Sequence, residues 1–125
     1  MLPWHKKRSS VLPASNRLRR ETDIKRLFAK GKGVFDELCG LKFAPTGLPA
    51  TRFAIVVGTK ISKKAVVRNK LKRQVRAILE KQLPRLVAGF DVSMLVRKEA
   101  LKADFSEIER HIVHALERAK LLKKA

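Results

Sequence analysis

The sequence predicts a single domain that combines helices with β-strands. Its 125 residues match the size of one domain, and 45% of them are hydrophobic, which is enough for a core. Apolar residues recur every three or four positions in some segments and every two in others, as in amphipathic helices and half-buried strands. We therefore expect a helix, strands, a helix, a strand and a helix over residues 17–125, preceded by a basic extended arm over residues 1–16.

The first helix is expected to end near Lys30, because the glycine that follows is a common stop signal. Thr22 is the candidate N-cap, since its hydroxyl can accept a hydrogen bond from the first turn. The spacing of the apolar residues in this segment predicts that three of them face the core: Ile24, Leu27 and Phe28.

Three segments have the pattern of strands. Alternating apolar residues predict a strand over residues 37–43, and the Pro- and Gly-rich residues 44–49 predict a loop after it. Residues 52–57 and 91–97 are short apolar runs rich in β-branched residues, which are typical of buried strands.

The last helix is expected to begin near Asp104, because this carboxylate and Glu107 have the spacing of a capping box. A stripe of apolar residues with helical spacing follows and predicts a core-facing side: Phe105, Ile108, Ile112, Leu116 and Ala119.

The net charge of +19 predicts a polyanionic partner, since RNA, DNA or an anionic membrane surface would relieve the self-repulsion. The charge is uneven. Residues 60–85 contain ten basic residues and one acidic residue, whereas residues 86–125 are nearly balanced. A solvated basic surface without a partner is the alternative, but such a surface normally intersperses both signs.

A long helix over residues 63–82 concentrates this charge on one side. Its apolar stripe spans an arc of about 80° and consists of Val67, Leu71, Val75 and Ile78. The other side presents four cations and an amide: Arg68, Asn69, Lys72, Arg73 and Arg76. Nucleic acid is the favoured ligand, because the apolar stripe lacks the Trp and Phe of a membrane-surface helix.

At these residues the sequence resembles the protein subunit of bacterial ribonuclease P. The family's signature is an Arg-Asn pair, a Lys-Arg pair after a gap of two residues, and an Arg after a further gap of two. In this sequence the signature occupies residues 68–76. As in the family, Ala65, Lys60 and an apolar strand led by Arg52 come before it. Residues 18–28 are similar to the family's opening helix, so the resemblance covers about residues 17–120.

The resemblance implies an α+β fold, a compact two-layer sandwich in the order α-β-β-β-α-β-α. It also implies a left-handed βαβ crossover that carries the Arg-Asn helix, although the general rule favours right-handed crossovers. The family's protein assists a catalytic RNA that removes the 5′ leader from precursor tRNA. That RNA performs the hydrolysis with Mg²⁺, and the protein lowers the Mg²⁺ requirement.

The resemblance also implies which residues meet the two RNA partners. The expected contacts to RNA are Lys60, Lys64, Arg68, Asn69, Lys72, Arg73 and Arg76. The expected leader cleft, between the sheet and the first helix, includes Phe28 and Arg52. The remaining alternatives are a ribosomal or general RNA-binding protein, which would not stimulate cleavage, and an autonomous protein nuclease.

The residues themselves favour a non-catalytic protein. The chain has 11 acidic residues and only Glu80 in the basic block, so we expect no catalytic carboxylate cluster, no protein-bound metal and no cofactor. Cys39 is expected to pack as a small hydrophobe, and His111 and His114 to form an ordinary surface pair. The lone cysteine and the lack of a signal peptide or a membrane-spanning run favour a cytoplasmic protein without a membrane partner or an obligate protein partner.

Overall fold

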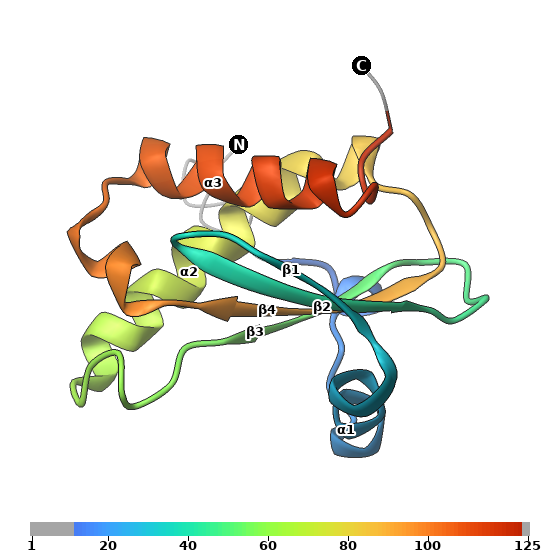
Figure 1. Ribbon diagram of the computed structural model, residues 1–125, viewed down its shortest axis with the longest axis horizontal. Coiled ribbons are helices and arrows are strands. Elements are labelled where there is room, and N and C mark those ends of the chain that lie inside the picture. The colour runs from blue at the N-terminus through green and yellow to red at the C-terminus, as the bar shows by residue number, and fades with distance from the viewer. Residues whose placement is uncertain (1–11, 124–125) are drawn as a thin grey trace, which may run out of the picture.

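The computed structural model describes residues 12–123, which fold into helices packed on a four-stranded sheet (Figure 1). The α-helices and strands are α1 (Glu21–Lys30), β1 (Lys32–Phe35), β2 (Cys39–Pro45), β3 (Arg52–Val56), α2 (Ala65–Gln82), β4 (Phe90–Val96) and α3 (Phe105–Arg118). Short 3-10 helices are η2 (Ala14–Asn16), η3 (Leu83–Arg85) and η4 (Lys98–Lys102).

The sheet has the strand order β1-β2-β4-β3 and mixes both kinds of pairing. β2 pairs antiparallel with β1 and with β4, whereas β3 pairs parallel with β4. Because parallel neighbours need a crossover, α2 connects β3 to β4. The expected α+β fold and its element order are therefore confirmed. The left-handed sense of the β3–α2–β4 crossover stays a prediction.

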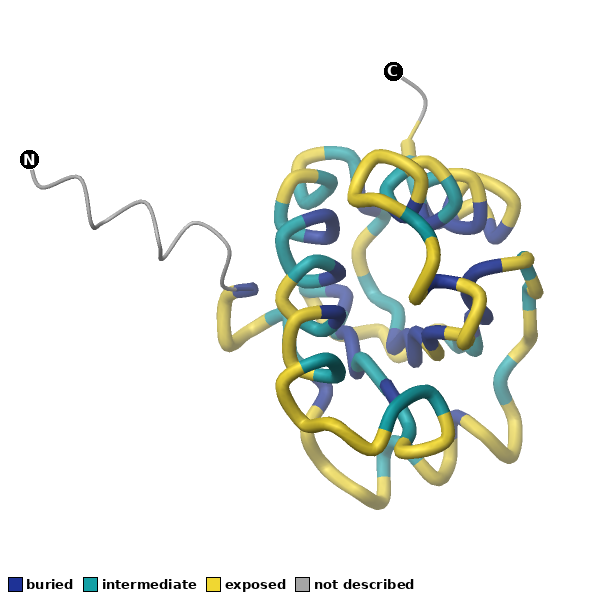
Figure 2. Tube along the Cα trace, turned by 90° about the vertical axis from the view of Figure 1, so that its left-hand side faces the viewer, coloured by how far each residue is buried: buried dark blue, intermediate teal, exposed yellow. Residues whose placement is uncertain are grey.

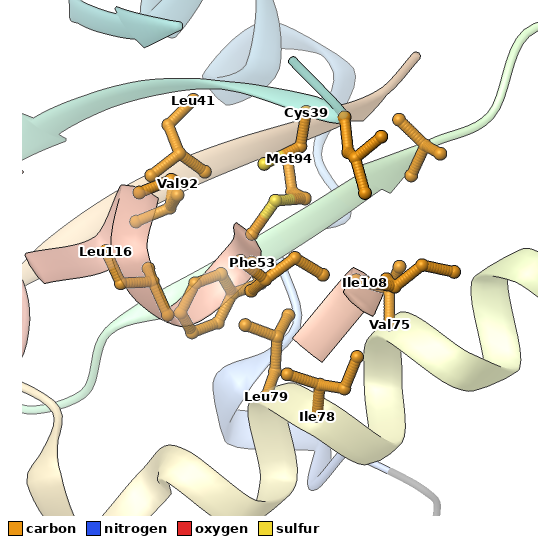
Figure 3. Packing of buried hydrophobic residues seen from close by; sticks show 14 of the residues in the cluster. Cys39, Leu41, Phe53, Val75, Ile78, Leu79, Val92, Met94, Ile108 and Leu116 are labelled. Carbon is orange, nitrogen blue, oxygen red and sulfur yellow. The ribbon is translucent and has the colours of Figure 1, made fainter. Parts of the chain in front are cut away.

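One face of the sheet packs against α2 and α3 and forms the main core (Figure 3). Phe53 and Met94 point from the sheet toward Val75 and Ile78 of α2 and Leu116 of α3, and none of these side chains is more than 2% exposed. Figure 2 shows that the buried residues of these helices lie on the inner side, with the exposed residues facing outward. The sheet and these two helices are the two layers of the sandwich.

The helix α1 lies on the opposite face of the sheet, beneath one end of it (Figure 1). Leu27 is the buried residue of α1, and it packs with Leu18 and Ala54 in a second, smaller core. Because successive strand residues point to opposite faces, Ala54 faces α1 while its neighbour Phe53 faces the main core. The other end of this face is left without a helix among the described elements.

Two predictions for α1 are wrong. The helix begins at Glu21, with Arg20 as an N-cap that makes no side-chain hydrogen bond, so Thr22 is not the cap. Phe28 is 46% exposed and does not face the core. The helix touches the sheet along a narrow line through Leu27, and the adjacent helical position, about 100° further round, is turned away.

The strands also differ from their predicted bounds. β2 begins at Cys39 and continues to Pro45, so residues 44–45 extend the strand into the predicted loop. The reason is long-range pairing, since β2 remains in register with β4 as far as the pair Pro45 and Phe90. The strand β1 was not identified individually, because its four residues include a glycine and only two apolar side chains.

The boundary expected at residue 16 does not separate an arm from the domain. Leu12 is 1% exposed and belongs to the main core, and the amide of Leu18 donates to the carbonyl of Phe53 at 2.8 Å. Residues 12–18 therefore cover the edge of β3, which would otherwise expose unpaired backbone groups. Residues 1–11 of the expected arm lie outside the described residues.

The start of α3 is as predicted. The Asp104 carboxylate accepts from the Glu107 amide at 2.9 Å, and the Glu107 side chain reaches back to the Asp104 amide. Most of the predicted stripe is buried, while Phe105 is 39% exposed. Among the helices described, none has the length and apolar character that crossing a membrane requires.

Candidate nucleic-acid interface

The helix α2 has the two faces that its sequence predicts. Leu71, Val75 and Ile78 are buried against the sheet, each 5% exposed or less. The opposite side, which we call the cationic face, consists of Arg68, Asn69, Lys72, Arg73 and Arg76. Two of these residues are exposed and three are half-buried, so their polar ends lie along one accessible surface. Lys60 and Lys64, in the loop before the helix, are exposed.

The charge of the cationic face is not offset by carboxylates. Within residues 12–123, the ion pair that α2 makes joins Lys81 Nζ to Glu109 Oε2 at 3.1 Å, at the far end of the helix. The first turn of α2 has no acidic residue, and its N-cap, Lys64, places a cation at the positive end of the helix dipole. Like charges spaced four residues apart also repel one another. An external anion would stabilise this arrangement.

Arg68 also holds the β3–α2 loop in place. Its Nη1 donates to the carbonyl of Ser62 at 2.8 Å, and the Ser62 hydroxyl accepts from the amide of Lys64 at 3.1 Å. These bonds fix the chain where it enters α2. Arg68 therefore has a structural role in addition to the RNA contact expected of it.

Arg52 lies on the α1 side of the sheet and is tied to two carboxylates. Its Nε and Nη2 donate to Asp91 at 2.8 and 2.7 Å, and Nη2 lies 3.5 Å from Asp23 on α1. The hydrogen bonds to Asp91 raise the pKa of the Arg52 guanidinium above its already high value. These contacts join α1 to the sheet.

A pocket of about 670 Å³ opens beside Arg52, between α1 and the adjoining ends of the strands. Arg20, Arg26 and Lys30 of this helical region line it, together with Leu48. Phe28 is not among the lining residues. The structure thus places both predicted cleft residues near α1, but it does not bring them together in one pocket.

The half of this sheet face that α1 leaves open carries exposed apolar residues that the sequence pattern does not reveal. Phe35 is 65% exposed and Leu95 is 41% exposed, and both point to the α1 side of the sheet. A largely apolar pocket of about 550 Å³, lined by residues that include Lys60 and Ile61, adjoins Leu95. Only the pairing register reveals this patch, because its members come from different strands.

Cys39 packs as a small hydrophobe, as predicted. It is 2% exposed, and burial, helped by the nearby Asp36 carboxylate, raises the pKa of its thiol to about 12. The thiol is therefore neutral at physiological pH.

The prediction of a histidine surface pair is wrong for His111. Its Nδ1 lies 2.7 Å from Oδ2 of Asp36, so it ties α3 to the turn between β1 and β2. His114 is exposed. Over the described part of the chain, no three or more His, Cys, Asp or Glu side chains are grouped as metal ligands would be.

The signature helix and the sheet lie inside the span recognised by a known family. A family model described as Ribonuclease P matches residues 12–120. The chain belongs to the ribonuclease P protein family. The resemblance seen at residues 68–76 is thereby confirmed, and a ribosomal or general RNA-binding protein is not favoured.

Individual relatives agree with this membership. A ribonuclease P protein component from Pseudanabaena is 37% identical over 113 residues, which cover 90% of this chain and 97% of the relative. The RNase P protein from Thermotoga maritima, solved in complex with 1-(4-fluorophenyl)-2-thiourea, is 34% identical with a TM-score of 0.76, covering 82% of this chain and 98% of that one. A Staphylococcus aureus RNase P protein, 24% identical, shares the fold with a TM-score of 0.80 over 86% of this chain and 98% of that one.

Proposed function

We propose that this chain is the protein partner of a catalytic RNA that removes the 5′ leader from precursor tRNA. The cationic face of α2, with Lys60 and Lys64, binds the catalytic RNA, and the sheet face beside α1 binds the leader. The RNA carries out the hydrolysis with Mg²⁺ that it holds itself. Relatives of this protein chain are named as ribonuclease P protein components, which supports this assignment.

The observation that carries the proposal is the uncompensated charge on α2. Arginine side chains can hold a phosphate through two parallel hydrogen bonds, and lysine attracts it as a point charge. Asn69 is exposed between them and can donate to or accept from a 2′-hydroxyl or a base edge. RNA supplies the negative charge in its phosphates and these polar groups in its riboses and bases.

The engagement of the carboxylates supports chemistry by the RNA. Asp23 and Asp91 bind Arg52, Asp36 accepts from the amide of Leu38 at 3.0 Å, and Asp104 caps α3. Two-metal hydrolysis by a protein needs clustered carboxylates that are available to the metals. Here Asp23 and Asp91 are both engaged by Arg52, while Asp36 and Asp104 make their structural contacts in two other parts of the fold.

The chemistry of an unpaired leader fits the sheet face beside α1. Single-stranded RNA is bound by aromatic side chains that stack on its bases and by cations along its backbone. Phe28 is exposed on α1, and Lys42 lies on the same side of the sheet. Arg52 acts here as a positioning residue, because it fixes α1 against the sheet.

The test is cleavage of a precursor tRNA by the catalytic RNA at low Mg²⁺, with and without the chain. The informative variant changes Lys72, Arg73 and Arg76 to Ala, since Arg68 also holds the loop. We expect it to fold normally but to lose RNA affinity and stimulation. The matched control removes three exposed cations elsewhere: Lys102, Arg110 and Lys123.

The outcomes separate the functional classes. A folded triple variant that binds the catalytic RNA as well as the unchanged chain would refute the assignment of the cationic face. Absence of any stimulation by the unchanged chain would instead support a general RNA-binding protein. Cleavage by the purified chain without RNA would indicate a protein nuclease.

A further inference from the structure

We propose that Phe35 is a stacking platform for an unpaired base of the precursor leader, at the end of the sheet that α1 does not reach. The inference rests on the proposed function and extends it to one more nucleotide. Three observations support it: the strand register, the packing of the Phe35 ring on the sheet and the positive charge around that ring.

The register aligns Phe35 with other residues in one row across the sheet. Phe35 pairs with Gly40, Gly40 with Leu95, and Leu95 with Val56. Directly paired residues point to the same face, so the row lies on the α1 side. Phe35 and Leu95 are two strands apart, which is about 10 Å. The row therefore forms an accessible apolar strip about the width of the sheet.

Two glycines allow the Phe35 ring to lie along the sheet. A Cβ placed on Gly40 would lie 3.3 Å from Cδ1 of the ring, and one on Gly33 would lie 3.3 Å from Cε2. These contacts reach opposite edges of the ring, so it spans both glycines. Since the side chain is nonetheless 65% exposed, its other face is available to a planar partner.

The structural alternative is that Phe35 only covers the glycines. Aromatic residues do stabilise glycine-containing strand pairs in this way. That role uses one face of the ring, and another apolar side chain can also perform it. Stacking uses the opposite face and requires an aromatic ring, so the two roles respond differently to substitution.

The surroundings favour a nucleic acid over an apolar protein partner. Lys42, on the adjacent row of the same face, and Lys60, in the pocket beside Leu95, flank the strip with positive charge. Arg97 and Lys98 follow directly after β4 and also line that pocket. Glu99 is the acidic residue lining it. A base on Phe35 would leave its phosphates near these cations.

Phe35 lies at a distance from the part of the sheet face where the leader would contact α1. Arg52 and Asp91 form a row at the α1 end of the sheet, and the Phe35 row lies four residues further along the strands. At 3.3 Å per residue this is about 13 Å. A leader that contacts both α1 and Phe35 must therefore span this distance along the sheet, so the two contacts involve different nucleotides.

The experiment measures binding of precursor tRNAs to the reconstituted RNA–protein complex, with leaders shortened one nucleotide at a time. The variants are Phe35→Leu, which keeps apolar cover over the glycines, and Phe35→Trp, which enlarges the stacking surface. Phe105→Leu is the matched control, because that ring is also partly exposed but lies at the start of α3. Urea unfolding of each variant checks that the fold is retained.

We expect Phe35→Leu to weaken binding by roughly 5- to 150-fold for precursors whose leader is long enough to reach Phe35, which is the range for loss of one base–aromatic stack. Binding of precursors with leaders too short to reach Phe35 should be unchanged. Phe35→Trp should retain the affinity for long leaders. If the affinity of Phe35→Leu depends on leader length in the same way as that of the unchanged chain, the role of Phe35 is overturned, but the proposed function is not. If the affinity of the unchanged chain does not depend on leader length at all, the assignment of the leader to this sheet face is overturned as well.

Discussion

Arg52 and Asp91 form a two-pronged ion pair at the edge where α1 meets the sheet. The pair joins neighbouring parallel strands at 2.8 and 2.7 Å, and Asp23 extends it to α1. The side chains of Arg52 and Asp91 are 23% and 10% exposed, so solvent screens the pair only in part. This geometry makes Arg52 a link between α1 and the sheet.

The first prediction concerns this link. Arg52→Ala leaves the largely buried Asp91 carboxylate without its partner, so the free energy of unfolding should fall by about 1.5–3 kcal/mol. Urea denaturation measures the change. Lys25→Ala is the control, because Lys25 pairs with Glu21 where both side chains are more than 70% exposed, and such pairs contribute at most about 1 kcal/mol. Equal losses in both variants would contradict the structural role of Arg52.

The contrast between Arg52 and α2 shows what the sequence could predict. The helix α2 was predicted to within two residues of its start, and its two faces correctly, because helical periodicity and charge segregation are local patterns. Arg52 was expected in a cleft, but its carboxylate partners are 29 and 39 residues away in the sequence. A local pattern carries no signal of such partners.

The residues on the sheet face beside α1 were the least predictable. Phe28 has the helical spacing of a core residue, yet α1 touches the sheet only along the line of Leu27. The Phe35 row exists only once β1, β2, β4 and β3 are paired in a particular register. Pairing between distant strands depends on tertiary packing, and short glycine-containing strands give a weak signal for it.

The second prediction concerns the Cys39 thiol. Burial holds its pKa at about 12 instead of 9.0, so the native state resists ionisation more than the unfolded state. The resulting stability is complete below pH 9 and is lost as the pH rises toward 12. The difference in unfolding free energy between the unchanged chain and Cys39→Ala should therefore shrink over this range. A constant difference would contradict the shift.

Thiol labelling gives an independent check of the same environment. A soluble disulfide reagent near neutral pH should label Cys39 only when the chain unfolds, because the thiolate is the reactive form and the residue is 2% exposed. The labelling rate should rise with urea in parallel with unfolding. Rapid labelling of the native chain would show that Cys39 is accessible.

The third prediction concerns the end of α3. Lys120 adopts φ 61°, the left-handed conformation, and the amides of Lys120 and Leu121 donate to the carbonyls of Glu117 and Leu116. This is the arrangement of a Schellman motif, in which glycine avoids steric strain. Lys120→Gly should raise the free energy of unfolding by about 0.5–1 kcal/mol, whereas Lys120→Ala, which keeps the Cβ, should not. A glycine variant no more stable than the alanine variant would contradict this.

The fourth prediction separates phosphate contacts on α2 from the general effect of a basic protein. Binding that releases counterions weakens with salt, and each phosphate contact contributes about 0.7–0.9 to the slope of log affinity against log salt. Changing Lys72, Arg73 and Arg76 to Ala should therefore lower the slope for the catalytic RNA by about 2–3. The Lys102, Arg110 and Lys123 variant removes the same formal charge away from the cationic face and should leave the slope nearly unchanged. Equal reductions in both variants would mean that the overall charge of +19, and not the geometry of α2, governs binding.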